Sequence, residues 1–320
     1  GRILQPCGGV ARPGAGGAVR SWRWNRLKHP MRNPWIYTLF IAPTLLLYGL
    51  FFLWPMLSSS FYAFTDWNGL ENYRFVGWSN FSDAFGDPDF RRAIVNNLIF
   101  IGFSVFVQIP LIVLFALLIA SVKRLRGFYK TTVFVPSIVS TSVIGILWGF
   151  IYEPEVGPLN RLLALFGAGP IYWLAEPKWA LPAVLIANAW QWMGFYIVLV
   201  LAAILAIPRE IHEAAIVDGA SGWQRALGIT VPLILPVVSV VVMLSIAGGM
   251  RVVDIVLVMT KGGPVGATEV MASYMVNEAM GVDPNYGFGT AIALVIFAFA
   301  LVLTSLYQFT FGRRMQGGEF

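Results

Sequence analysis

The chain has 320 residues, of which 58% are hydrophobic and 12% are charged, and its mean hydropathy is +0.72. This balance excludes an ordinary soluble domain and predicts an all-α integral membrane protein. The net charge of +6 would suggest nucleic acid as a partner of a soluble protein. Basic residues on the cytoplasmic side of a membrane explain it better, so we expect the lipid bilayer, and no nucleic acid, as a partner.

Chemistry that depends on cysteine, histidine or a phosphate loop is not expected. The single cysteine, Cys7, excludes an internal disulfide framework, and the two histidines, His29 and His212, lack metal-binding spacing. The sequence contains no G-x-x-x-x-G-K-[ST] motif, so the chain does not bind ATP through a P-loop. We therefore predict no metal site, no catalytic residue and no cofactor in this chain.

Six apolar runs are long enough to cross a bilayer. Residues 1–33, rich in glycine and arginine, are predicted to form a disordered cytoplasmic tail, and Met31 leaves the natural start of the chain open. A transmembrane domain follows at 34–312, with helices expected at about 34–57, 93–121, 132–151, 179–206, 231–258 and 287–310, and then a cytoplasmic tail at 313–320. Trp54-Pro55 is expected to end the first helix, and Pro136 to bend the third.

Charge predicts the orientation of these helices. If six spans alternate, one side of the membrane carries Arg20, Arg23, Arg26, Lys28, Arg32, Lys123, Arg124, Arg126, Lys130, Arg209, Arg225, Arg313 and Arg314. The other side holds most of the acids, namely Asp66, Glu71, Asp83, Asp87, Asp89, Glu153, Glu155 and Glu176, together with five basic residues. Both termini and the loop at about 207–230 are therefore predicted to be cytoplasmic.

That loop contains a short helix, a glycine corner and a second helix. Pro208 and Glu210 favour a helix start, and Gly219 suits the left-handed residue that ends a helix. Ser221 and Gln224 form an S-x-x-Q capping box, which predicts a second helix up to about Gly228. An amphipathic connector between two membrane spans would account for such a loop on general grounds.

The order of residues in the loop is more specific. It carries Glu213, Ala214 and Ala215, then Asp218, Gly219 and Ala220, then Ile229 and a proline at 232 or 236. This pattern resembles the EAA loop of ABC-importer permeases, most closely the carbohydrate-uptake (type I importer) family related to the maltose and glycerol-phosphate permeases. The resemblance covers residues 36–312 and includes the external loop segments with Pro154, Gly157 and Asn160, and with Thr260 to Pro264.

The resemblance implies an assembly and a mechanism. Its partners are a second homologous permease, two ATPase subunits that bind ATP and Mg, and an external solute-binding protein that delivers a sugar. The six residues from Glu213 to Ala220 named above would lie on the helix that enters a cleft of the ATPase, which drives alternating access. Whether the second permease is a different chain or a second copy, and which sugar is carried, stay open.

The fourth span contains side chains that lipid would not favour, among them Asn188, Trp190, Gln191, Trp192 and Tyr196. Polar groups at membrane depth face the bundle interior or a wet cavity, and aromatic faces with amides suit a sugar. They equally suit contacts between helices. The resemblance favours a pocket at Trp192, Met193 and Gly194, and at Ser245 of the fifth span. The predicted pocket is Asn188, Trp192, Met193, Gly194, Tyr196, Ser245 and Gly249.

Two further predictions concern direction and charge. Gln191 and Trp192 are adjacent on a helix, so one of them should face the cavity and the other a neighbouring helix. Arg251 and Asp254, expected on the fifth span, either pair on one helix face or contact the solute. The competing class is a secondary transporter driven by an ion gradient, but residues 93–122 and 231–250 contain no ionisable group for it.

Overall fold

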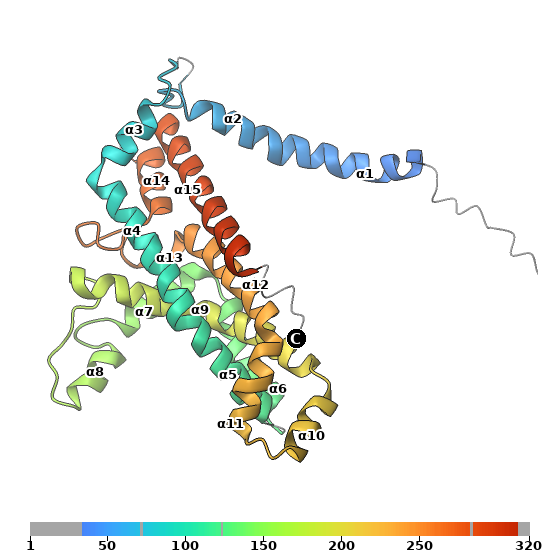
Figure 1. Cartoon of the computed structure of the whole chain (residues 1–320). Helices are drawn as coiled ribbons and strands as arrows, with labels where there is room; N and C mark the ends of the chain where they lie inside the picture. The colour runs from blue at the N-terminus through green and yellow to red at the C-terminus, as the bar shows by residue number, and fades with distance from the viewer. Residues whose placement is uncertain (1–33, 71–72, 123, 282–283, 313–320) are drawn as a thin grey trace, which may run out of the picture. The chain divides into compact units, whose positions relative to one another are not determined.

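The computed structural model describes residues 34–70, 73–122, 124–281 and 284–312 (Figure 1). The two predicted tails, with Met31, Arg313 and Arg314, lie outside the described residues, as do Glu71, Lys123 and Asp283. The chain divides into two compact units, residues 1–55 and 56–320, and each is described by itself. In the described ranges the regular elements are helical, and extended pairing is limited to an isolated bridge between Thr65 and Phe75.

The first unit contains the start of the first apolar helix. The prediction that this helix ends at Trp54-Pro55 was wrong. Helix α1 (Pro34–Tyr48) continues through a π-helical turn, η2 (Gly49–Leu53), into α2 (Trp54–Tyr62). Pro55 lacks the N–H of a helix interior and crowds the carbonyl four residues earlier. The wider π turn directly before it relieves that conflict, so the helix passes Pro55 and ends eight residues later than Trp54.

In the second unit, four further helical runs are long and apolar enough to cross a membrane: Pro88–Ser121, Pro177–Ala206, Gly222–Met250 and Tyr286–Thr310. The first comprises α4 (Pro88–Phe103), the π turn η3 (Ser104–Gln108) and α5 (Ile109–Ser121), and the second is α9 (Pro177–Ala206). The third comprises α11 (Gly222–Arg225), the π turn η5 (Ala226–Thr230) and α12 (Val231–Met250). The fourth comprises α15 (Tyr286–Tyr307) and part of the π turn η6 (Gln308–Gly312).

The third predicted span is broken rather than bent. Helix α6 (Arg126–Phe134) runs through a 3-10 turn, η4 (Val135–Ile138), and α7 (Thr141–Ile151) leaves at 100° after a two-residue gap. Pro136 was expected to cause a bend. It lies in the first turn of η4, and the change of direction follows at Val139, whose backbone is extended. The described residues thus contain five helices long and apolar enough to cross a membrane, or six if this pair counts as one span.

The fifth span also ends earlier than predicted. Helix α12 stops at Met250, and a separate helix, α13 (Asp254–Met259), begins after a short break. The valine-rich sequence on both sides of the break has the hydropathy of a continuous span, so the periodicity of residues 231–258 concealed it.

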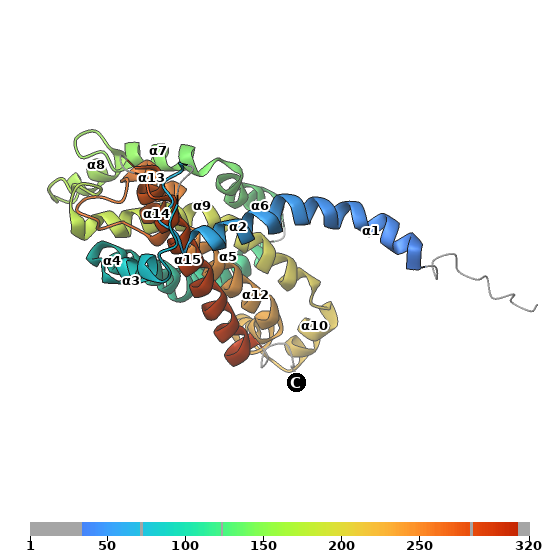
Figure 2. The ribbon, with the colours of Figure 1, turned by 90° about the horizontal axis from the view of Figure 1, so that it is seen from above.

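Shorter helices cover the ends of the second unit: α3 (Ser79–Gly86), α8 (Pro158–Ala164), α10 (Arg209–Val217) and α14 (Met271–Met280). Figure 1 shows α3 and the start of α15 at one end of this unit and α10 and α11 at the opposite end. Helix α14 lies beside α15 in both views (Figure 1, Figure 2).

Three apolar clusters hold the second unit together. One joins α5, α9 and α12, and includes Ile112, Leu201 and Ile234. A second joins α3, α4, α14 and α15 around Phe90 and Ile292, and a third joins α4, α7, α9 and α13 around Ile255. The cavity described next lies where α4, α9, α12 and α13 meet.

Candidate functional site

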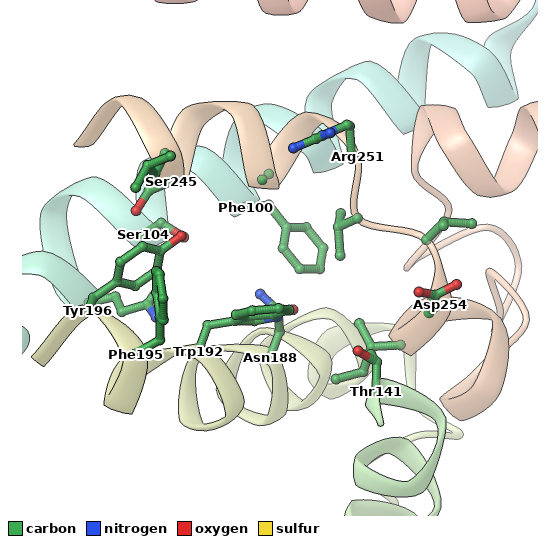
Figure 3. Close-up of a pocket in the computed structure, with 17 residues that line it drawn as sticks. Phe100, Ser104, Thr141, Asn188, Trp192, Phe195, Tyr196, Ser245, Arg251 and Asp254 are labelled. Atoms are coloured by element: carbon green, nitrogen blue, oxygen red, sulfur yellow. The ribbon is translucent and has the colours of Figure 1, made fainter. Parts of the chain in front are cut away.

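A cavity of about 370 Å³ opens between these helices, a volume within the range of small-molecule sites (Figure 3). Its polar or aromatic lining residues are Phe100, Ser104, Gln108, Thr141, Asn188, Trp192, Phe195, Tyr196, Ser245, Arg251 and Asp254. Figure 3 shows Asn188 and Trp192 on one wall, from α9, and Ser245 and Arg251 opposite them. The cavity therefore combines aromatic faces with hydroxyl, amide and charged groups.

Helix α9 presents one stripe of side chains to this cavity. Trp192 follows Asn188 by four positions, and Phe195 and Tyr196 follow Trp192 by three and four, which places all of them on the side of α9 that carries Trp192. Gln191 points elsewhere: its Nε2 donates to the carbonyl of Val139 at 3.2 Å and to Oγ1 of Thr141 at 3.1 Å. Adjacent Trp192 and Gln191 thus divide as predicted, one toward the cavity and one toward a neighbouring element.

Two residues of the predicted pocket do not line this cavity. Met193 packs against the apolar cluster of α5, α9 and α12. Gly194 lies against α6, where a Cβ would stand 2.5 Å from the carbonyl carbon of Val133 and 3.1 Å from Cα of Phe134. Its missing side chain therefore admits a neighbouring backbone, one of the two uses expected of it. Residues 193 and 194 follow Trp192 by 100° and 200° around the helix, which turns them away from the cavity.

The α12 wall carries Ser245, Gly248 and Gly249. Ser245 is 5% exposed, and its Oγ lies beside the hydroxyl of Tyr196, which is close enough to interact with it. Gly249 lines the cavity, yet a Cβ there would lie 2.8 Å from Cγ1 of Ile101, so α4 occupies the side-chain space. Gly248 has nothing within 4 Å of such a Cβ and leaves room in the cavity.

The break after α12 overturns one alternative for Arg251 and Asp254. Arg251 is the C-terminal cap of α12, and Asp254 is the first residue of α13, so they do not share a helix face. In the described part of the chain neither side chain has an ion-pair partner within 4.0 Å. Both line the cavity instead.

Amide side chains hold the cavity walls in place. Asn97 Nδ2 donates to the carbonyl of Gly249 at 2.7 Å, and Asn97 Oδ1 accepts from the N–H of Met271 at 2.8 Å. Gln108 Nε2 donates to the carbonyl of Ala189 at 3.3 Å. These bonds satisfy backbone groups at membrane depth, where water does not reach them. The amide side chains therefore have two roles: those of Gln191 and Asn97 connect neighbouring elements, and that of Asn188 faces the cavity.

Sequence reasoning did not identify Phe195 of α9, nor the lining residues outside α9 and α12, namely Phe100, Ser104, Gln108 and Thr141. Ser104 and Gln108 were detectable, because they are polar residues one turn apart inside an apolar run. Phe100 and Phe195 carry no such signal, since lipid also accepts phenylalanine.

The loop at 207–230 forms a second candidate site. Helix α10 ends at Val217, Gly219 follows its cap with a φ of +78°, and the N–H of Ala220 donates to the carbonyl of Ala215 at 2.9 Å. These are the features of a glycine-terminated helix end. Ser221 and Gln224 exchange both bonds of the predicted capping box, so the corner has the local structure that was expected. The second helix does not stop at Gly228, because it continues through η5 into α12.

The corner between α10 and α11 exposes large apolar side chains. Ala215 is buried, whereas Glu213, Ala214, Asp218 and Gly219 are exposed. The exposed surface also contains four large apolar side chains: Ile216, Val217, Trp223 and Leu227, at 56, 86, 64 and 62%. An exposed apolar patch ringed by polar residues is typical of a protein interface.

Two predicted external loops are held by their own polar contacts. Asn160 Nδ2 donates to the carbonyls of Pro154 and Ile171, and its Oδ1 accepts from Nε1 of Trp173 at 2.9 Å. In the 260–270 loop, Oγ1 of Thr268 donates to the carbonyl of Gly263 at 2.7 Å. These bonds favour a structural role for both segments over a chemical one.

Comparison with known proteins places these features in a family context. Residues 89–316 match the family model described as "Binding-protein-dependent transport system inner membrane component". The chain is 32% identical to the diacetylchitobiose uptake system permease protein of Streptomyces coelicolor, over 94% of this chain and 89% of that one. It is 31% identical to the lactose transport system permease protein of Rhizobium radiobacter, over 86% and 92%. A solved bacterial alginate ABC transporter, in complex with an alginate-bound periplasmic protein, contains a chain with a TM-score of 0.79 and 25% identity, over 91% of this chain and 98% of that one.

Proposed function

The chain belongs to the family of binding-protein-dependent transport system inner membrane components, and on that premise we propose that it passes a saccharide through the cavity between α4, α9, α12 and α13. The observation that carries this proposal is the cavity lining. Trp192 and Phe195 offer apolar faces on which a sugar ring can stack, and Asn188, Tyr196 and Ser245 offer groups for its hydroxyls. The chain is a permease subunit of an ABC importer, so the ion-gradient alternative is set aside.

The names of the relatives support the saccharide class, since they include permeases for diacetylchitobiose and lactose. The buried hydroxyl of Ser245 supports it independently. Its Oγ lies beside the hydroxyl of Tyr196 at the cavity wall, and a solute hydroxyl placed there would bond to this pair. Gly248 leaves the space in which that solute would lie.

The partners of the assembly follow from the family and from the exposed corner. An external solute-binding protein delivers the saccharide, a second homologous permease completes the pathway, and two ATPase subunits bind ATP and Mg. The corner of Glu213, Ala214, Ala215, Asp218, Gly219 and Ala220, with the exposed Trp223 and Val217, docks on one ATPase. Both termini and this corner lie on the cytoplasmic side, and this chain contributes no ATP site and no cofactor.

The mechanism is alternating access. Closure of the ATPases moves α10 and α11, and because α11 is continuous with α12 through η5, the movement is transmitted along one helical rod to Ser245. The far end of that rod is the break at Arg251, so the cavity wall is also the end of the moving element. The broken helix α6–α7 and the break after α12 are the places where the helix directions can change most easily.

A matched pair of variants on α9 tests the cavity. Trp192 and Trp190 are 39 and 41% exposed, but only Trp192 lines the cavity. Loss of a stacked ring contact of about 1–3 kcal/mol corresponds to a loss of about ten- to hundredfold in affinity. We expect Trp192→Ala to raise the half-saturating concentration for uptake by that factor in proteoliposomes that contain the whole importer. Trp190→Ala should change it less than threefold, roughly 0.6 kcal/mol.

ATP hydrolysis stimulated by the loaded binding protein should persist in Trp192→Ala, because the coupling corner is unchanged. Equal uptake by wild type and Trp192→Ala, with normal assembly, would place the solute path elsewhere, for example in the partner permease. Uptake that continues after the partner ATPases are inactivated would contradict the importer mechanism itself.

A further inference from the structure

Among the residues that the structure describes, two charged side chains line the cavity, and neither has a charged partner there. Arg251 and Asp254 flank the break between α12 and α13, and within the described residues neither belongs to an ion pair or a side-chain hydrogen bond. Figure 3 shows them at different places around the cavity, Arg251 on the α12 side and Asp254 on the side of Thr141. Both residues are exposed, and both line the cavity.

This arrangement needs a physical reason. Both residues lie directly after the Gly222–Met250 span, and two opposite charges three residues apart on one helix would ordinarily neutralise each other. Here the helix break separates them. The break also leaves the backbone of Arg251 and Val252 along the cavity wall, beside both charges.

We propose that Arg251 and Asp254 bind the transported solute directly and select an uncharged polyhydroxylated compound against acidic and amino analogues. The inference rests on the proposed function of the cavity and assigns two residues to it. A guanidinium only donates hydrogen bonds and a carboxylate only accepts them. A hydroxyl group does both, so a solute rich in hydroxyls satisfies both residues at once.

Charged analogues satisfy only one of the two. A carboxylate on the solute would bind Arg251 but would be repelled by Asp254, and an ammonium group would meet the opposite conflict. The rest of the lining is formally neutral, including Ser245, Tyr196 and Asn188, so nothing else in it compensates a solute charge. Selection against charge therefore depends on the opposite signs of these two residues.

The test measures charge selectivity without the binding protein, which would otherwise impose its own. The complete importer complex is purified without it, and dissociation constants for glucose, glucuronate and glucosamine are measured by saturation-transfer NMR at millimolar concentrations. The variants Arg251→Gln and Asp254→Asn each remove one charge with little change of shape. Arg161→Gln on α8, which does not line this cavity, is the control for loss of a positive charge.

We expect wild type to bind glucose more tightly than either charged sugar. Asp254→Asn should raise the affinity for glucuronate relative to glucose by about tenfold, and Arg251→Gln should do the same for glucosamine, because a charge-assisted hydrogen bond remains while the repulsion is lost. Arg161→Gln should leave all ratios unchanged. A merely structural role would weaken all three sugars together and leave their ratios constant.

The inference is overturned if the ratios do not change, if wild type prefers a charged sugar, or if it binds none of the three. The variant Trp192→Ala distinguishes this failure from failure of the proposed function. If Trp192→Ala abolishes binding while the charge variants leave the ratios unchanged, the cavity is the site and the assignment of Arg251 and Asp254 is wrong. If Trp192→Ala also binds like wild type, the cavity itself is not the solute site.

Discussion

A substitution at Gly194 can distinguish whether this residue packs against a neighbouring helix or contacts the solute, because its surroundings leave no room for a side chain. A Cβ at this position would lie 2.5 Å from the carbonyl carbon of Val133. Normal contact between such atoms is about 3.5 Å, so the α6 backbone would have to retreat by at least about 1 Å. Overpacking of this kind costs about 1–3 kcal/mol, and backbone cannot move aside as a flexible side chain can. We therefore expect Gly194→Ala to lower the melting temperature of the purified permease complex.

The displacement would reach the cavity as well, since α6 leads through η4 to Val139 and Thr141, both of which accept from Gln191. Reduced uptake should thus accompany reduced stability. Gly102→Ala in α4 is the matched control, because a Cβ there meets nothing within 4 Å, and alanine in an open helix position stabilises by about 0.5–1 kcal/mol. If Gly194→Ala kept the wild-type melting temperature but bound solute poorly, Gly194 would face the solute and the packing explanation would be refuted.

Two further predictions concern the coupling corner and the orientation. Gly219→Ala should strain a residue whose φ is +78° by about 1 kcal/mol and should weaken the stimulation of ATP hydrolysis. Gly228→Ala, where a Cβ meets nothing within 4 Å, should leave that stimulation unchanged. Equal stimulation in both variants would show that the corner is not part of the ATPase interface. With Cys7 replaced, a cysteine at Ser221 should react with an impermeant thiol reagent only in inverted vesicles, and one at Asp87 only in spheroplasts. The reverse labelling would overturn the assigned orientation.

Features set by neighbouring residues could be predicted from the sequence. The capping box of Ser221 and Gln224 and the left-handed Gly219 were both expected and are both present, because a few adjacent residues determine such structures. The spans at 177–206 and 286–310 likewise match expectation to within about two residues, since long apolar runs bounded by polar loops leave little choice of ends.

Features that depend on contacts between residues far apart in the sequence could not be predicted. Beside the break after Met250, the amide of Asn97 donates to the carbonyl of Gly249 and its oxygen accepts from Met271, and both partners are far from Asn97 in the sequence. The same holds for Gly194, because nothing in the fourth span indicates that the backbone of Val133 lies against it. Periodicity identifies which residues share a face, and only packing decides what that face meets.

Arg251 and Asp254, whose role the sequence left undecided, also illustrate this limit. Arg251 and Asp254 at a spacing of three were compatible with a self-neutralised pair on a continuous helix, and the apolar run around them gave no reason to expect otherwise. A helix break between them removes that pairing, and it does so where the cavity is open. Because Arg251 and Asp254 line the cavity with no ion-pair partner among the described residues, both charges are available to a solute there, which is the basis of the selectivity proposed above.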